Sequence, residues 1–160
     1  KGIDHLLLAL HRAPDWQLWI AGTGEDEARL RALAAPLGER VRFLGRLPRE
    51  QLYLTMQAAD YFALYSGYEG LAHTLLESLR VGTPVIASAR GGNSEVVREG
   101  SNGLLVPHVD VEALADALQR ALQPGLRAAL AAHADDDLER FRFSTMLEQT
   151  DAVLRACLRP

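Results

Sequence analysis

The chain has 160 residues, of which 48% are hydrophobic and 24% charged, and its net charge is −4. These values indicate one globular domain with a sizeable core, and they exclude a basic field for nucleic acid. The one cysteine, Cys157, excludes an internal disulfide, and no apolar run approaches the ~20 residues of a membrane span, so we expect a cytoplasmic protein in a reducing compartment.

Short apolar runs alternate with amphipathic stretches along the chain. Residues 25–37 carry apolar side chains at helical spacing, and Pro48 suits the first turn of a helix. In chain order, the sequence predicts a helix at 3–12, a strand at 17–22, a helix at 25–37, a strand at 41–45, a helix at 48–59, a strand at 61–66, a helix from near Leu71 that ends before Gly82, a strand at 84–88, a short helix at 93–99, a strand at 103–106, and helices at 110–122, about 126–140 and 144–158.

This alternation of strands and helices predicts βαβ units and therefore a parallel sheet covered on both faces. With right-handed crossovers, the predicted fold is a doubly wound, Rossmann-like α/β domain that includes the whole chain, residues 1–160. Ligands bind such sheets where the strands end at their carboxyl side. The segments that follow the predicted strands are therefore the places to look for a site.

Gly22-Thr23-Gly24 follows a strand and precedes a helix, like the start of a dinucleotide fingerprint. The third glycine of that motif would fall at position 27, which is Glu27. A carboxylate there repels a pyrophosphate but suits the dipole of a helix start. A tight turn before a helix is the simpler interpretation.

The turn from Ser66 to Gly70 joins a strand to a helix at the edge where ligands bind. Gly70 allows close approach of a ligand to the backbone, and the N–H groups of Leu71, Ala72 and Thr74 would favour an anion such as a diphosphate. The alternative is that Ser66 or Glu69 simply caps the helix.

Glu69 and Glu77 are eight positions apart in an otherwise apolar segment. Eight helical steps give roughly 12 Å of rise and about 80° of rotation, so the two carboxylates converge only if Glu69 lies in the loop. Glu77 would then lie about two turns into the helix. Its two acceptor oxygens suit a pair of vicinal sugar hydroxyls, although an exposed surface glutamate is an equal alternative.

Three further features of the sequence bear on a ligand site. Residues 90–95 form a glycine-containing loop that is either a second place for an anion or a plain turn. Lys1 could reach a phosphate. We expect His73 near the site because of its place in the motif, and none of the five histidines has metal-binding spacing, so no metal site is expected.

Taken together, the blocks in this chain resemble a known family. In order, they are KG, a strand that ends in GTG, VRFLGRLP, AADYFALYSGYEGLAHTLLES, GTPVIASARGGNSEVV and GLLVP. Their order resembles the donor-binding, C-terminal domain of retaining GT-B glycosyltransferases, specifically glycosyltransferase family 4, from Lys1 to about Leu122. The spacing E-x7-E is the most specific part of the resemblance.

The resemblance implies a transferase that takes a hexose from a nucleotide-sugar donor without a metal, and it assigns roles to individual positions. Glu69 would contact hydroxyls of the donor sugar, Glu77 would bind the ribose hydroxyls, and Lys1 would neutralise the diphosphate. Glu69 and Lys1 are the predicted catalytic residues. The other predicted donor-binding residues, which act mainly through backbone amides or as turn glycines, are Gly70, Leu71, Ala72, His73, Thr74, Leu75, Gly22, Gly24 and Gly45.

The chain departs from the family pattern in three ways. The family often has E-G-F-G where this chain has Glu69-Gly70-Leu71-Ala72, and Ala72 would narrow the approach to the backbone. The family arginine upstream of the lysine is missing. The first, central strand of the domain would also precede Lys1, so we expect five strands, with an open slot between residues 17–22 and 61–66 or one filled by another segment.

The resemblance also places the acceptor, a glycan, lipid or small molecule, in an N-terminal domain that this chain does not contain. We therefore expect no turnover from this chain alone, and any membrane association would come through the missing domain. Two other functions remain open from the sequence. One is a non-catalytic nucleotide-binding or scaffold module of the same fold. The other is a flavodoxin- or receiver-like signalling domain, for which neither an acidic cluster nor a flavin loop is evident.

Overall fold

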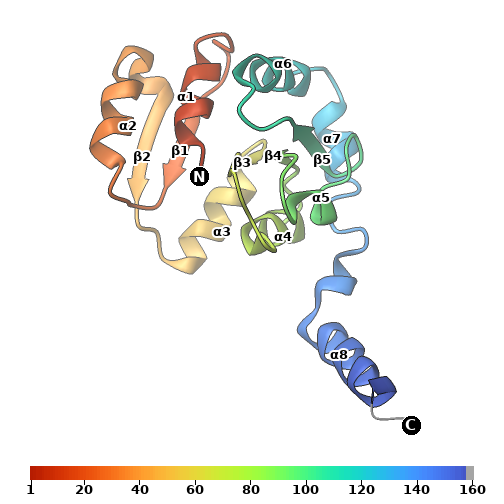
Figure 1. Cartoon of the computed structure of the whole chain (residues 1–160). Coiled ribbons are helices and arrows are strands. Elements are labelled where there is room, and N and C mark those ends of the chain that lie inside the picture. The colour runs from red at the N-terminus through yellow and green to blue at the C-terminus, as the bar shows by residue number, and fades with distance from the viewer. Residues whose placement is uncertain (158–160) are drawn as a thin grey trace.

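The computed structural model describes residues 1–157 of the chain. Helices and strands alternate from the first residues to β5, which ends at Val106, and helices complete the chain (Figure 1). In order, the elements are α1 (Ile3–Leu10), β1 (Leu18–Ala21), α2 (Glu27–Ala34), the 3-10 helix η1 (Ala35–Arg40), β2 (Val41–Gly45), α3 (Arg49–Ala58), β3 (Phe62–Leu64), α4 (His73–Arg80), β4 (Val85–Ser88), α5 (Asn93–Val96), β5 (Gly103–Val106), α6 (Val111–Ala121), α7 (Leu126–Ala131), the 3-10 helix η2 (Leu138–Phe141) and α8 (Phe143–Cys157).

The strands form two parallel sheets. One has the order β1-β2, with Leu18 opposite Val41, and the other has the order β3-β4-β5, with Val85 opposite Phe62 on one side and Gly103 on the other. The predicted α/β fold with parallel, Rossmann-like strand pairing is therefore confirmed, and residues 1–157 contain five strands, as expected.

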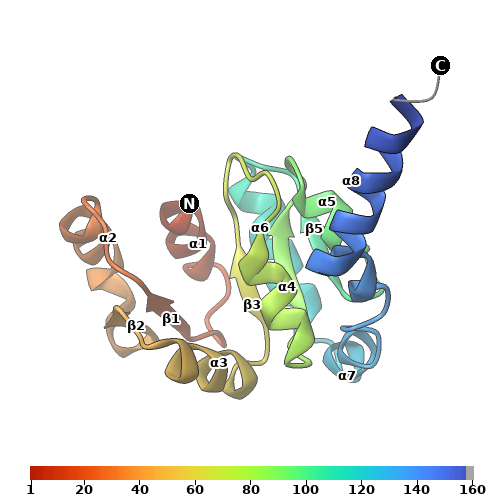
Figure 2. The same ribbon diagram turned by 90° about the horizontal axis from the view of Figure 1, so that it is seen from below.

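Side chains of the β3-β4-β5 sheet alternate between two apolar cores. Ile86 packs with α1 and α6 on one face, whereas Val85 and Ala87 pack with α4 on the other. The arrangement of these helices around the sheet can be followed in Figure 2. A third core lies between α1, α2 and the β1-β2 sheet. Helix α1 belongs to two of these cores, because Leu6 packs toward the larger sheet and Leu7 toward the smaller one.

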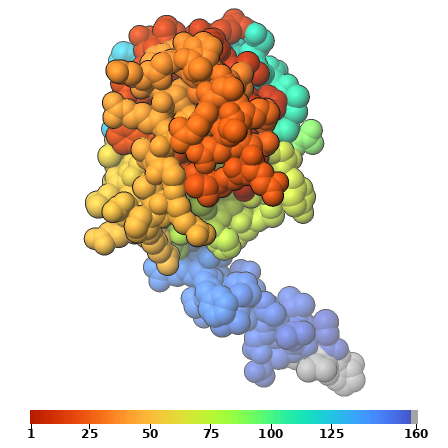
Figure 3. Space-filling view, turned by 90° about the vertical axis from the view of Figure 1, so that its left-hand side faces the viewer, coloured from red at the N-terminus to blue at the C-terminus, as the bar shows by residue number. Residues whose placement is uncertain are grey.

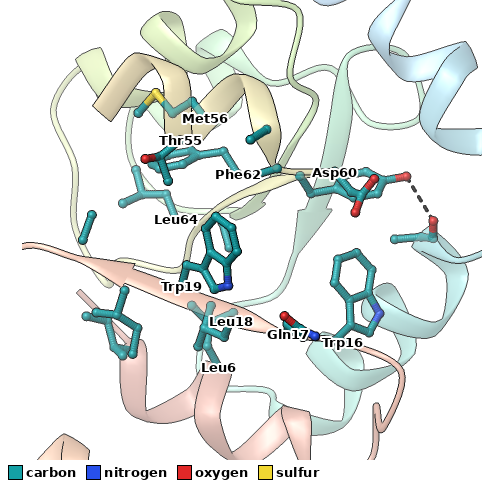
Figure 4. Close-up of a pocket in the computed structure, with 18 of the residues that line it drawn as sticks. Leu6, Trp16, Gln17, Leu18, Trp19, Thr55, Met56, Asp60, Phe62 and Leu64 are labelled. Carbon is teal, nitrogen blue, oxygen red and sulfur yellow. Dashed lines mark hydrogen bonds between the residues drawn. The ribbon is translucent and has the colours of Figure 1, made fainter. Parts of the chain in front are cut away.

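A cavity of about 860 Å³ lies between β1 and β3. Its walls come from Leu18 and Trp19 on one side and from Phe62 and Leu64 on the other (Figure 4). No backbone pairing joins β1 to β3 within residues 1–157, so each strand has one edge free along this cavity. We call this space the slot.

Several helices end earlier than the sequence pattern predicts. The helix predicted at 3–12 ends as α1 at Leu10, and the helix predicted at 93–99 ends as α5 at Val96, because Val97 is extended. The predicted helix at 25–37 ends as α2 at Ala34, because Pro36 and the left-handed Gly38 convert its last turn into η1. The predicted helix at 126–140 is divided into α7 and η2. Three consecutive aspartates, which favour turns, end at Asp137, whose φ of 64° is left-handed.

Helix α8 extends away from the rest of the domain (Figures 1 and 3). It has no buried residue, and it exposes the apolar side chains of Phe143, Leu147, Val153 and Leu154. The predicted helix at 144–158 is thus confirmed up to Cys157, and residue 158 lies outside the described residues. None of the helices described for this chain combines the length and the apolar character that crossing a bilayer requires.

Candidate active site

Lys1 and Glu69 are in contact although 68 positions separate them, with Nζ donating to Oε1 at 2.5 Å. Gly2 makes this approach possible. It has a φ of 69°, and a Cβ at this position would lie 2.1 Å from the carbonyl oxygen of Tyr65, the residue that follows β3. The start of α1 therefore lies directly against the carboxyl end of β3, where the loop that carries Glu69 begins.

The Lys1 ammonium is the main group that lowers the pKa of Glu69. Burial alone would raise the pKa of this carboxyl, because its side chain is only 14% exposed, but the hydrogen bond and the charge of Lys1 bring the pKa below its ordinary value. Glu69 is therefore an ionised acceptor at neutral pH, and Lys1 is a cation held beside it.

The loop after β4 fixes the turn that contains Glu69. The N–H of Gly92 donates to the carbonyl oxygen of Glu69 at 3.0 Å. A Cβ on Gly91 would lie 2.1 Å from that oxygen, and a Cβ on Gly92 would lie 1.6 Å from the carbonyl oxygen of Gly70. The two glycines thus allow two backbones to cross, which the sequence pattern of residues 90–95 did not indicate.

Helix α4 begins at His73, two residues later than predicted, and Ala72 is its N-cap residue. No side chain caps this helix, so the alternative in which Ser66 or Glu69 caps it is wrong. Within residues 1–157, the N–H groups of His73 and Thr74 have no recorded backbone or side-chain acceptor. This helix start therefore keeps the free donors and the partial positive charge that an anion would use.

The other predicted residues of this motif differ in what they can offer. Gly70 and Leu71 are exposed, and no atom would lie within 4 Å of a Cβ on Gly70. The side chains of Ala72 and Leu75 are buried in the core, and the N–H of Leu75 already donates to the carbonyl oxygen of Ala72 at 3.0 Å. The methyl group of Ala72 therefore does not narrow the approach of a ligand to the backbone, contrary to expectation, and Leu75 has no free N–H to offer a ligand.

Glu77 is the fifth residue of α4, so it lies just over one turn into the helix and not two. Its side chain is 29% exposed. The Tyr53 hydroxyl donates to Oε1 at 3.0 Å, and the guanidinium of Arg49 lies 3.6 Å from the same oxygen. The sequence pattern did not indicate Tyr53 or Arg49, because no spacing in the chain connects α3 with the E-x7-E motif.

Gly22, Gly24 and Gly45 lie where β1 and β2 end. The N–H of Gly22 donates to the carbonyl oxygen of Gly45 at 2.7 Å, and both residues have positive φ angles, of 119° and 65°. These glycines close the carboxyl edge of the small sheet, in agreement with the tight-turn interpretation. The slot reaches from this edge to the motif, because Ala21, Lys1 and Thr74 all line it.

The comparisons with known proteins agree with this geometry. The family model described as "Glycosyl transferases group 1" matches residues 1–136. A lipopolysaccharide core biosynthesis glycosyltransferase of Rhizobium meliloti is 36% identical over 141 residues, which cover 86% of this chain and 41% of that protein. The chain therefore spans about two fifths of the length of this curated relative.

Two solved structures resemble the chain closely. Sucrose-phosphate synthase from Thermosynechococcus elongatus has a TM-score of 0.85 and 33% identity, with 98% of this chain and 42% of that chain covered. Anabaena HepE, solved in complex with UDP-glucose, has a TM-score of 0.80 and 26% identity, with 98% of this chain and 45% of that chain covered.

Proposed function

Since the chain belongs to the glycosyl transferases group 1 family and has the fold of a GT-B C-terminal domain, we propose that it is the donor-binding half of a nucleotide-sugar-dependent glycosyltransferase. In this proposal, the enzyme belongs to glycosyltransferase family 4 and transfers a hexose, with retention, to an acceptor held by another domain. The contact between Lys1 and Glu69 is the observation that carries the proposal, because it brings together the two residues that the chemistry needs.

The leaving group of such a reaction is a nucleoside diphosphate, on which negative charge develops. Lys1 and the free N–H groups of His73 and Thr74 supply positive charge without a metal ion, so we propose a metal-independent reaction. Glu69, ionised and partly buried, would accept hydrogen bonds from hydroxyls of the donor sugar. Glu77, on the next turn, would accept hydrogen bonds from the ribose hydroxyls.

Donor binding is tested by calorimetric titration of UDP, GDP and ADP. We expect one diphosphate to bind and Glu77→Ala to weaken it about tenfold, which corresponds to ~1.4 kcal/mol. Glu148→Ala is the matched control, because Glu148 is exposed on α8, away from the site. Absence of binding to all three diphosphates would contradict the proposal and favour the alternative of a non-catalytic scaffold module.

We also propose that a further parallel strand, from another segment or another chain, occupies the slot. The free edges of β1 and β3 and the apolar walls support this proposal, since an unpaired strand edge leaves backbone groups without partners. Trp19, which is 45% exposed at the slot, is the natural probe. In a Trp16→Phe background, acrylamide should quench Trp19 strongly in the 160-residue chain and weakly in the longest natural chain that contains it. Equal quenching would exclude a strand in the slot.

The acceptor domain is part of the same proposal, and it implies that residues 1–160 alone do not turn over. A coupled assay for release of nucleoside diphosphate should give no signal above background for these residues. Sugar transfer by the isolated chain would refute the proposal that the acceptor is bound by a second domain.

A further inference from the structure

A chain of hydrogen bonds connects α3 to the carboxylate of Glu77. The Nε of Arg49 donates to the Tyr53 hydroxyl at 2.9 Å, and this hydroxyl donates to Oε1 of Glu77 at 3.0 Å. Arg49 and Tyr53 are one turn apart on α3, and the guanidinium carbon of Arg49 lies 5.4 Å from the centre of the Tyr53 ring.

The direction of this chain is fixed by its chemistry. A guanidinium N–H can only donate, so the Tyr53 oxygen must accept from Arg49. The single hydroxyl proton of Tyr53 must then be donated to a different group, which is the Glu77 carboxylate. Because the donor reaches Oε1, rotation of the carboxylate about its last bond is restricted.

The arrangement leaves the second oxygen of Glu77 available. No hydrogen bond to Oε2 is recorded within residues 1–157, and the side chain is 29% exposed, so this oxygen can meet a ligand. Glu77 lies on the turn that follows the free N–H groups of His73 and Thr74. A carboxylate fixed on one oxygen and open on the other is suited to accept a hydroxyl in one defined orientation.

We propose that Tyr53 is a positioning residue that orients Glu77 toward the ribose hydroxyls of a nucleoside diphosphate, and that Arg49 holds the Tyr53 hydroxyl in the donating direction. This inference rests on the proposed function, since it requires Glu77 to accept those hydroxyls. With this role, α3 becomes part of the donor site. The preference for ribose over a sugar that lacks the 2′ and 3′ hydroxyls then depends on Tyr53, which need not touch the ligand.

The test compares two probes in the longest natural chain that contains these residues. One is the diphosphate that binds most tightly among UDP, GDP and ADP, and the other is its 2′,3′-dideoxy analogue. Tyr53→Phe removes the hydroxyl and keeps the ring, so it should weaken the ribose form about tenfold and the dideoxy form less than twofold. Arg49→Met should produce a change in the same direction, because the hydroxyl can then rotate away from Glu77 and the guanidinium 3.6 Å from Oε1 is lost.

Tyr61→Phe is the matched control. It removes a tyrosine hydroxyl that donates to the carbonyl oxygen of Ala121 at 3.1 Å and not to Glu77, so it should leave the ratio of the two affinities unchanged. If Tyr53→Phe weakens both probes equally, or neither, the positioning role is refuted even when Glu77→Ala shows that Glu77 binds the ribose. If Glu77→Ala binds the diphosphate as tightly as the wild type does, the proposed role of Glu77 is refuted, and the positioning role of Tyr53 is refuted with it.

Discussion

Gly92→Ala tests the crossing of the two loops that hold Glu69. Gly92 has an ordinary φ of −68°, so alanine meets no backbone strain there and the effect is purely steric. Its Cβ would lie 1.6 Å from the carbonyl oxygen of Gly70, whereas real Cβ atoms stay at least 3.0 Å from such an atom. One of the two backbones must therefore move by about 1.4 Å.

The expected cost follows from three contributions. Overpacking of this kind costs roughly 1–3 kcal/mol. Displacement also weakens the hydrogen bond from Gly92 to Glu69, which contributes about 0.5–1.5 kcal/mol. The lower entropy of the unfolded alanine chain offsets roughly 0.4–1 kcal/mol. We expect a net loss of about 2 kcal/mol, or a Tm lower by about 4–8 °C for a chain of this size.

Urea unfolding followed by tryptophan fluorescence measures this loss, and Gly24→Ala is the control. Gly24 also has an ordinary φ, and no atom would lie within 4 Å of its Cβ, so its substitution should not destabilise the protein and should add about 0.4–1 kcal/mol through the lower entropy of the unfolded chain. Nucleoside diphosphate binding should also weaken in Gly92→Ala, because the turn that carries Glu69 moves. A Gly92→Ala variant as stable as the wild type would show that the loops do not cross as described.

Two other predictions concern charge and capping. Lys1→Met should raise the pKa of Glu69, because burial raises this pKa and the opposing charge of Lys1 is then gone; carbon-detected NMR titration of the carboxyl measures the change. Since the folded-state pKa of Glu69 is lowered in the wild type, the stability that the Lys1–Glu69 pair provides should be complete above about pH 4.3 and be lost as the pH falls through the lowered pKa. This loss of stability at low pH should be smaller in Lys1→Met. Asp110→Ala removes the side chain that accepts from the N–H of Ala113 at 2.8 Å, so it should cost about 1 kcal/mol in urea unfolding, whereas Asp116→Ala on the exposed face of α6 should cost almost nothing; equal effects would exclude the cap.

Strands were the most predictable part of the fold. The boundaries of β2 and β5 agree with the sequence prediction at both ends, because glycines or a change from apolar to polar residues mark them. Helix ends were less predictable where good helix formers lie just outside a helix. Leu71 and Ala72 are good helix formers, yet they lie before α4, since Ala72 packs into the core in an extended conformation.

The site was predictable only as far as local motifs reach. The Glu69 loop and the position of Glu77 on the following helix could be placed from E-x7-E and the flanking glycines. The family resemblance assigned both Lys1 and Glu69 to the donor site, but their direct contact was not predicted, because it joins residues 68 positions apart in the sequence. The contact between Tyr53 and Glu77 could not be predicted, since it depends on how α3 packs beside α4, which no residue pattern encodes.

The double role of α1 has a consequence for how the domain unfolds. Its side chains enter both the core of the β3-β4-β5 sheet and the core of the β1-β2 sheet, which share no strand pairing within residues 1–157. Without a strand in the slot, we expect the smaller sheet to be a separate foldon, attached through α1 and through the packing of Trp16 and Leu18 on the larger core, so its amides should open at a lower free energy than those of β4. A strand in the slot would join both sheets into one cooperative unit. The residues of the donor site would then become disordered only when the whole domain unfolds.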